Sequence, residues 1–446
     1  MTPQDPTGRA RIGLALLLGL LSVLGPVSID MYLPALPAIA DDLDAAASVV
    51  QLSLTACMVG LAAGQVVVGP LSDARGRRGP LLVSLVLFVL SSLLCALAPT
   101  AGTLVAARFL QGFTASAGLV LSRAVVRDVF SGGDLTRFFA VLTAITAVAP
   151  LIAPVIGGGI LWLPLGDWRA VFVFLAVLGA AVALIAALGL GETLPRERRV
   201  PGSVGGSLRS MGALLRDRSF FGYALVVGLL HGGSFAYVAG TPFVYQDLHG
   251  VSAQAFGVLF AVNGLAMILG SASVGRLSDR WSERTLLRAA AVAAVASTGA
   301  VLVATLVGAP LVALAVPLFV YMAAMGATLA CGFALAMHGQ ERRAGAASAL
   351  IGAFPMVVGA VAAPLVGLDE TTAVPMGAVL FGSAALALLA LYALTGPRAN
   401  ADAGAGTGAG RPTETGAGTE AETGVGARVR RTMARGRRLR GRETGR

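Results

Sequence analysis

The sequence predicts an all-α, multi-pass membrane protein with twelve transmembrane helices in two pseudo-symmetric six-helix bundles. Three observations support this fold class. Hydrophobic residues make up 56% of the 446 and charged residues only 13%, whereas a typical soluble domain is about half apolar and a quarter charged. Apolar stretches of about 20 residues, the length that crosses a roughly 30 Å hydrocarbon core, recur along the chain. The motif G-x-L-S-D occurs twice, at residues 69–73 and 275–279.

Helices are expected rather than strands, because the alternating patterns of membrane barrels are absent and a helix bonds its own backbone in lipid. The first apolar run follows Arg9 and Arg11 and imitates a signal peptide, with residues 38–40 in the position of a cleavage site. A signal peptide has an apolar region of roughly 7 to 15 residues. This run is longer and further spans follow at once, so we interpret it as the first helix.

Polar breaks divide the apolar stretches into the expected spans, at residues 12–36, 48–70, 80–98, 102–124, 135–160, 168–190, 219–243, 254–276, 284–308, 310–337, 343–366 and 373–396. The longest polar break lies between the sixth and seventh spans. This predicts an N-terminal bundle at 1–190, a cytoplasmic linker at 191–218 and a C-terminal bundle at 219–396. The Arg-rich segment 397–446 is too poor in apolar residues to form a core and is predicted to be disordered.

Arginine is expected to fix the orientation, because positive charge near span ends is retained on the cytoplasmic side. With the N-terminus inside, all but two of the 33 basic residues lie in cytoplasmic segments or adjoining helix ends, the exceptions being Arg108 and Arg169. Both termini are therefore predicted to be cytoplasmic, in the cell membrane. The chain has no lysine, so it cannot carry the phosphate-binding motif G-x-x-x-x-G-K-[ST], and an energy source other than ATP is implied.

Two six-span halves with matching loop motifs resemble the major facilitator superfamily from the first span to the last. Its signature loop, G-x-L-x-D-R-x-G-R-R, is matched by Gly69, Leu71, Asp73, Gly76, Arg77 and Arg78, and repeated in part by Gly275, Leu277, Asp279 and Arg280. At position 74 this chain has alanine where the family's loop usually has arginine. A narrower resemblance is to the Bcr/CflA subfamily of multidrug:proton antiporters, through IDMYLPALPAIA (29–40), RFLQG (108–112), GDWRAVF (166–172), GETL (191–194) and YVAGTPFVYQDLHGVS (237–252).

The resemblance implies a proton-coupled secondary transporter that exports small amphipathic drugs or antibiotics by alternating access. Its partners would be a small-molecule substrate, protons and the lipid bilayer, with no cofactor, no metal, no nucleic acid and a monomeric state. The alternative is a proton-coupled exporter or importer of an endogenous metabolite such as an amino acid or sugar. An enzyme is disfavoured because the spans lack paired acids or a nucleophile with its base, and a sensor because no soluble domain is present.

The signature loop is predicted to act as a gate. Asp73 is expected to accept hydrogen bonds from the positive N-terminal end of a neighbouring helix, and Arg77 and Arg78 to bond carbonyls or carboxylates across the gap. Such contacts would latch one half against the other in one conformation and break in the next. A positive-inside anchor is the alternative, but it does not explain the aspartate or the second copy with Asp279 and Arg280.

Asp30 lies inside an apolar run, and an ionisable residue there is a functional candidate by default. It is roughly 27 Å along the first helix, and Arg108 lies roughly 9 Å into the fourth from the opposite end, so the two have a comparable depth. Asp30 is expected to carry the coupling proton, with Arg108 as its partner and Gln111 shaping the site. A static Asp30–Arg108 bridge is the alternative.

A mostly apolar cavity with a few polar groups is expected for the substrate. Its candidate lining residues are Tyr32, Gln111, His231, Phe235, Tyr237, Asn263, Met267 and Phe354. His231 lies near the middle of its span, where Gly232 and Gly233 would leave room for cargo; a hydrogen-bonded packing role is the alternative. By resemblance, APVIGG (153–158) is the family's antiporter motif, and its Pro154, Gly157 and Gly158 would either seal the path against proton leak or pack helices.

Overall fold

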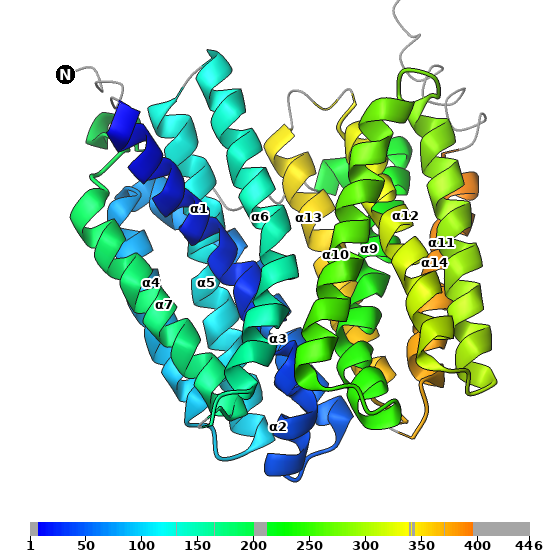
Figure 1. Ribbon diagram of the computed structural model, residues 1–446. Coiled ribbons are helices and arrows are strands. Elements are labelled where there is room, and N and C mark those ends of the chain that lie inside the picture. Colours follow the sequence, from blue (N-terminus) through cyan, green and yellow to red (C-terminus); the bar gives the residue numbers. More distant parts are fainter. Residues whose placement is uncertain are drawn as a thin grey trace, which may run out of the picture. The chain divides into compact units, whose positions relative to one another are not determined.

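The computed structural model describes residues 8–130, 132–164, 166–199, 212–338, 340, 344–369 and 371–395, all within one compact unit, Met1–Asn400. Twelve helices of 19 to 30 residues account for most of the described chain (Figure 1). They are α1 (Gly8–Asp30), α3 (Ala47–Arg75), α4 (Arg78–Ala96), α5 (Ala101–Val129), α6 (Gly132–Leu161), α7 (Trp168–Gly189), α9 (Arg218–Phe243), α10 (Ala253–Leu277), α11 (Glu283–Leu306), α12 (Leu311–Met337), α13 (Ala344–Val366) and α14 (Val374–Leu394).

Each predicted span has its helix, and the predicted fold class is confirmed. Over their described residues, ten helical segments are long and apolar enough to cross a membrane, while α6 and α13 contribute the shorter apolar stretches Val148–Leu161 and Leu350–Val366. The middle of the predicted linker, residues 200–211, and the whole predicted tail, residues 397–446, lie outside the described residues.

The first span departs from the prediction of one continuous helix. It breaks after α1, where Leu33–Ala35 forms the 3₁₀ turn η1, and resumes as the short helix α2 (Leu36–Asp42). Pro34 and Pro37 lack the backbone N–H that a continuing helix requires, and each also disfavours helical geometry in the residue before it. The break leaves Asp30 at a helix end.

The helices pair in the same order in each half of the chain. In the first half α1 contacts α6, α3 contacts α5 and α4 contacts α7; in the second, α9 contacts α13, α10 contacts α12 and α11 contacts α14. Figure 1 shows α1 to α7 gathered on one side and α9 to α14 on the other. The two sets meet through α6 on α10 and α3 on α13.

Glycine allows the tightest of these pairs. A side chain at Gly60 of α3 would overlap the Phe109 carbonyl of α5, and one at Gly270 of α10 would overlap the Ala323 carbonyl of α12. Such close backbone approach is typical of membrane helices, which gain little from the hydrophobic effect once inserted. The two crossings occupy equivalent places in the two sets, as the pseudo-symmetry requires.

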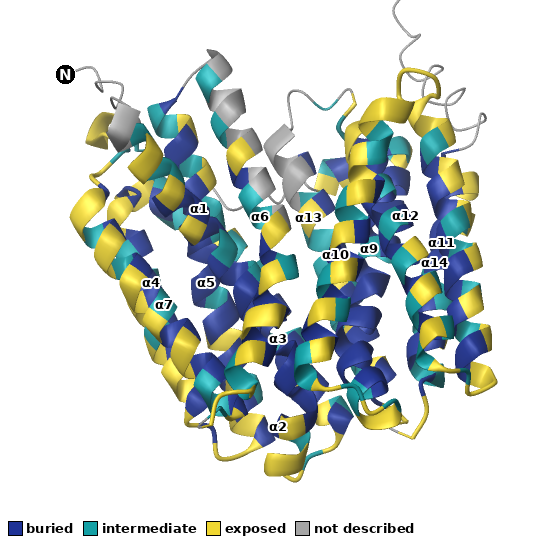
Figure 2. Cartoon of the chain, in the orientation of Figure 1, coloured by how far each residue is buried: buried dark blue, intermediate teal, exposed yellow. Residues whose placement is uncertain are grey.

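The outward sides of the helices are exposed (Figure 2), and many of their exposed residues are large and apolar. The exposed apolar residues on these sides include Val86 and Leu94 of α4 and Leu184 of α7. The polar residues of the spans are instead turned inward, where Arg108, Gln111 and Asn263 are buried. This inversion of the pattern of a soluble protein fits a chain whose outer surface faces lipid.

Candidate functional site

A buried polar cluster lies around Arg108 of α5. The guanidinium Nη1 donates hydrogen bonds to the Ser28 carbonyl of α1, 2.9 Å away, and to Gln111 Oε1. Its central carbon lies 4.1 Å from the centre of the Tyr32 ring, a cation–π distance. Gln111 in turn donates to Ser92 Oγ of α4 at 2.8 Å. The structure therefore brings together three predicted residues, Tyr32, Arg108 and Gln111.

Arg108 has no acidic partner among the described residues, although it is fully buried. Its Nε and Nη2 atoms are buried and lack hydrogen-bond partners in the described part of the chain. A buried ion that is left unpaired is costly by several kcal/mol. Nε and Nη2 point along one edge of the guanidinium plane, the edge that binds both oxygens of a carboxylate. The N–H groups on this edge of Arg108 are therefore two adjacent donors that no described residue uses.

The predicted pairing of Asp30 with Arg108 is wrong for this structure, where no ion pair joins them. Asp30 is 8% exposed at the end of α1, and the Ser28 carbonyl and Gln111 occupy Nη1 of Arg108 instead. Asp30 comes two residues before Tyr32, whose ring lies over Arg108, so it is close to the Arg108 cluster but not bonded to it.

A second cluster lies in the other set. Asn263 of α10 donates to the Tyr237 hydroxyl of α9 at 3.0 Å, and the Tyr237 ring stacks on Phe260 with centroids 5.2 Å apart. Phe235, two residues earlier in α9, lies with Met58 of α3 around Gly359 of α13, at the boundary between the sets. The predicted residues Tyr237 and Asn263 are thus bonded to each other, and Phe235 lies at the boundary between the sets.

His231 lies 5.9 Å from Phe235, centroid to centroid, and its Nδ1 atom is buried without a partner. The prediction that Gly232 and Gly233 leave room for cargo is wrong. A side chain at Gly232 would overlap Val358 of α13, and one at Gly233 would come within 2.6 Å of Ser383 of α14. The glycines allow close helix contact and leave no open space.

Phe354 and Met267, the other predicted lining residues, lie at contacts between helices. The Phe354 ring packs edge-on against Phe221, 5.9 Å away, near the start of α9. Met267 lies at the α10–α12 crossing, where a side chain at Gly326 would overlap its carbonyl oxygen. These contacts are those of helix packing.

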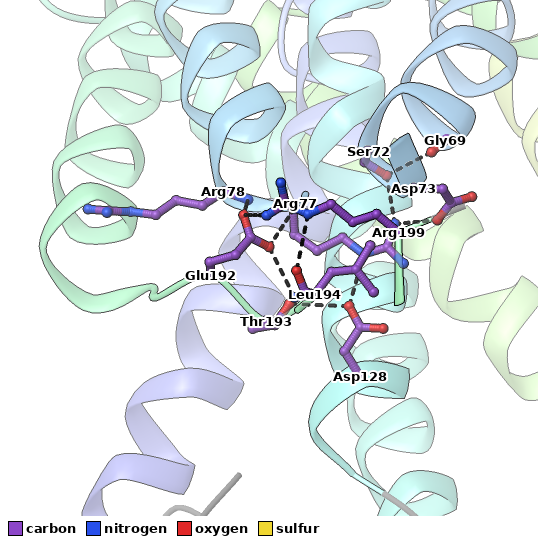
Figure 3. Close-up of polar contacts among 10 residues, drawn as sticks. All are labelled: Gly69, Ser72, Asp73, Arg77, Arg78, Asp128, Glu192, Thr193, Leu194 and Arg199. Carbon is purple, nitrogen blue, oxygen red and sulfur yellow. Dashed lines mark hydrogen bonds and ion pairs between the residues drawn. The ribbon is translucent and has the colours of Figure 1, made fainter. Parts of the chain in front are cut away.

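The signature loop forms an ionic cluster at the opposite end of the first set (Figure 3). Arg77 bonds Asp128 at the end of α5 through Nε at 2.9 Å, and Asp73 through Nη1 at 2.5 Å. Glu192, just after α7, accepts the backbone N–H groups of Arg77 at 2.8 Å and Arg78 at 3.3 Å. The cluster therefore ties together the ends of α3, α4, α5 and α7.

In this structure the loop does not join the two halves, because every partner of Arg77 lies in its own half. The predicted latch breaks in one of the two conformations, so it stays a prediction. Asp73 also does not accept from a helix N-terminus: its side chain is 51% exposed and pairs with Arg77 one turn away. Glu192 fills that role at the start of α4. In the second copy, Gly275, Asp279 and Arg280 are exposed, and the side chains of Asp279 and Arg280 have no partner in the described part of the chain.

The charges of the cluster shift its proton equilibria. Burial alone would lower the pKa of Arg77, but hydrogen bonds and charge from Asp128 and Asp73 raise it above its ordinary value. Burial would raise the pKa of Glu192, but three backbone N–H groups and Arg199 lower it. Sequence reasoning missed the roles of Asp128 and Glu192. The signals were present, since Asp128 is the acid at the inner end of the fourth span and Glu192 lies in GETL.

Three glutamine side chains connect the two sets at the end away from the signature loop. Gln51 donates to the Ala239 carbonyl at 3.2 Å, Gln246 to the Pro34 carbonyl at 3.2 Å, and Gln254 to the Gly158 carbonyl at 3.3 Å. Each donor and its acceptor belong to different helix sets. Sequence reasoning had not singled out these residues.

The predicted antiporter motif lies in the same region. A side chain at Gly157 would overlap the Met31 carbonyl beyond α1, and one at Gly158 would come within 2.8 Å of the Ala253 carbonyl at the start of α10. A side chain at Gly257 would come within 2.7 Å of the Pro154 carbonyl. The motif therefore makes close backbone contact with the other set, while α6 continues as a helix through both prolines.

Comparison with known proteins agrees with the fold. Residues 18–364 match the family model of the Major Facilitator Superfamily. The chain is 57% identical to the uncharacterized MFS-type transporter YdgK of Bacillus subtilis, over 89% of this chain and 98% of that protein. It is 32% identical to the bicyclomycin resistance protein homolog of Haemophilus influenzae, over 85% and 95%. A solved bacterial homolog of the lysosomal transporter Spinster, inward-facing and unoccupied, superposes with a TM-score of 0.69 at 16% identity, over 87% and 98%.

Proposed function

The chain belongs to the major facilitator superfamily, a family of membrane transporters, and from this premise we propose that it exports small amphipathic compounds, antibiotics among them, in exchange for protons. The sets 1–190 and 219–396 would be the bundles that move, in the cell membrane, with both termini cytoplasmic and the protein acting as a monomer. The antibiotic in the name of the Haemophilus influenzae relative supports the cargo class.

The proposal of proton coupling rests on one observation: a carboxyl group and a guanidinium group are both buried but do not pair with each other. Neither Asp30 nor Arg108 has an ion pair within the described residues, and both are buried. A buried carboxylate without a cation is unfavourable, and protonation removes that penalty. Asp30 would bind its proton in this arrangement and release it when the site opens to the other side.

Alternating access is supported by where the two sets touch. The bonds of Gln51, Gln246 and Gln254 lie at the end that the arginine distribution assigns to the outside. The signature loop at the other end bonds only its own set. This is the contact pattern of a transporter closed outside and released inside. The close contact of Pro154 and Gly158 with the other set would then be part of the outer seal.

The cargo would lie between the clusters of the two sets. Phe235, Tyr237 and Phe260 supply aromatic surface, and the free edge of Arg108 supplies two hydrogen-bond donors. This combination suits an amphipathic compound with a paired acceptor group. The same free edge favours one second candidate, export of an amino acid, whose carboxylate matches it.

The experiment is uptake into inverted membrane vesicles with an imposed pH gradient, acidic inside, using bicyclomycin and a panel of amino acids. We expect acid-driven accumulation of bicyclomycin by the wild type and none by Asp30→Asn. Asp41→Asn removes the same charge from an exposed position and is expected to match the wild type. Antiport that is unchanged in Asp30→Asn would refute the proton role, and accumulation of amino acids alone would select the second candidate.

A further inference from the structure

A basic cleft lies outside the transport path, where α4 begins and the segment after α7 lies against it. Its volume is about 740 Å³. Four guanidinium groups and two carboxylates share its walls with three apolar side chains, the residues being Arg75, Arg78, Arg196, Arg199, Glu192, Glu197, Leu82, Leu194 and Pro195, with Gly79. Figure 3 shows Glu192 between Arg78 and Arg199 at this place.

The cleft carries positive charge that the protein does not neutralise. Glu192 is already engaged by the backbone N–H groups of Arg77 and Arg78 and lies 3.7 Å from Arg199. The guanidinium of Arg78 donates to the Ala187 carbonyl at 2.8 Å and has no acidic partner among the described residues. Within the described residues, the exposed side chains of Arg75 and Arg196 make no hydrogen bond or ion pair. Several donors therefore remain for an anion.

The position of the cleft indicates what kind of anion these donors would bind. It opens where the exposed apolar faces of α4 and α7 end. On α4, Val83 is 60% exposed, one residue beyond Leu82 of the cleft wall. On α7, Leu188 is 81% exposed and lies next to the Ala187 carbonyl that Arg78 bonds. Lipid tails cover such faces, and the phosphate of a phospholipid lies at the depth where they stop.

We propose that this cleft binds the phosphate of an anionic phospholipid, whose acyl chains lie along the exposed faces of α4 and α7. The guanidinium groups of Arg75, Arg78 and Arg196 hold the phosphate, and Leu82 and Leu194 contact the glycerol end of the chains. The arginine distribution places the site in the cytoplasmic leaflet. The site is independent of cargo and of proton coupling.

The test measures lipid retention by native mass spectrometry of the full chain, purified in detergent with equal amounts of phosphatidylglycerol and phosphatidylcholine. The wild type is expected to retain phosphatidylglycerol in preference. Each guanidinium near the membrane surface contributes about fivefold in affinity, so Arg75→Gln/Arg196→Gln should weaken retention on the order of 30-fold. The control Arg216→Gln/Arg276→Gln removes two exposed arginines elsewhere and should retain the lipid as the wild type does.

Two further measurements distinguish lipid binding from the binding of a free anion and from a loss of folding in the variants. Inorganic phosphate or glycerol phosphate, added at the concentration of the lipid, should not displace it. The thermal unfolding midpoint of both double variants in lipid-free detergent should match the wild type. The proposal is overturned if the wild type retains both lipids equally, if Arg75→Gln/Arg196→Gln retains phosphatidylglycerol like the control, or if free phosphate competes at equal concentration.

Discussion

Arg108 is the residue whose shape, as well as charge, is used by the buried cluster. Arg108→Lys keeps the charge but loses the planar face over Tyr32 and one edge of donors. We expect transport to fall at least about tenfold, the equivalent of losing one hydrogen bond to a charged group. The measurement is the initial efflux rate at equal amounts of protein in the membrane.

The control for Arg108 is Arg216→Lys, at an exposed position, which should transport at the wild-type rate. If Arg108→Lys also kept the full rate, the guanidinium geometry would have no part in transport. Only its positive charge would then matter.

Glu192 should contribute to stability in a pH-dependent way. The lowered pKa of Glu192 means that the folded state favours its carboxylate form. The contribution of this carboxylate to the free energy of unfolding is therefore present above pH 4.5, its ordinary pKa, and is lost as the pH falls through the lowered pKa. Because the side chain is partly exposed, we expect Glu192→Gln to lose less than about 1 kcal/mol at neutral pH. Thermal unfolding midpoints of variant and wild type in detergent should differ at pH 7 and converge below pH 4.5.

Glu197→Gln is the matched control, since Glu197 is an exposed acid in the same segment. Its midpoint should follow the wild type at every pH. A Glu192→Gln difference that persisted unchanged in acid would show that the amide shape, and not the charge, disturbs the start of α4.

At the scale of one element, α6 carries two glycines with opposite surroundings. A side chain at Gly157 would overlap the Met31 carbonyl, whereas Gly159, two residues later, has no atom within 4 Å of the position of a side-chain carbon. A backbone carbonyl cannot move as a flexible side chain does. We expect Gly157→Ala to destabilise this arrangement by about 1–3 kcal/mol and to lower transport, because overpacking forces the helices apart.

Gly159→Ala should leave transport unchanged and raise the unfolding midpoint slightly, since alanine reduces the freedom of the unfolded chain. The two variants have the same composition and differ only in position. Equal behaviour of the two would mean that α6 does not contact the Met31 carbonyl in the working protein.

The break after α1 places Tyr32 in the Arg108 cluster. A continuous helix would bond the backbone through residue 36, but η1 interrupts it at Leu33–Ala35 and leaves Tyr32 as a turn residue over Arg108. The Pro34 carbonyl then accepts the side chain of Gln246 from the other set. The prolines in the sequence indicated a break, whereas the contacts of the turn depend on α5 and on η3 (Val244–Leu248), which lie far away in the chain.

At the scale of the whole molecule, three uncharged hydrogen bonds join the sets at one end. Each is worth about 0.5–1.5 kcal/mol, so replacing Gln51, Gln246 and Gln254 by Leu should raise the population open at this end at least about tenfold. Spin labels at the exposed positions Leu163 and Leu248 would report the separation. A longer-distance component should grow in the triple variant.

Gln340→Leu is the control, because Gln340 bonds Asp217, the residue just before α9, at 2.9 Å and joins no residue of the first set. It should leave the label distances unchanged. The native cysteines Cys57, Cys95 and Cys331 are buried, which favours labelling at the introduced sites. An unaltered distance distribution in the triple variant would mean that helix packing alone holds this end closed.

By itself the sequence determined the number of membrane helices, their approximate ends and the family. These are local properties: an apolar run of sufficient length, a polar break and a loop motif can each be read without knowing what lies opposite. It also placed Arg108, Gln111 and Tyr32 in one site, because two motifs of one family carry them, RFLQG and IDMYLPALPAIA.

Only the tertiary structure decided which groups meet. Arg108 bonds the Ser28 carbonyl 80 residues away and not the nearby Asp30, and Arg77 bonds Asp128, 51 residues away, and Glu192, 115 residues away, within its own half. Such partners depend on how each helix is rotated about its axis and on which helix lies beside it. An apolar span facing lipid on one side and protein on the other has little pattern to encode that rotation, so it is set by the packing of the assembled helices.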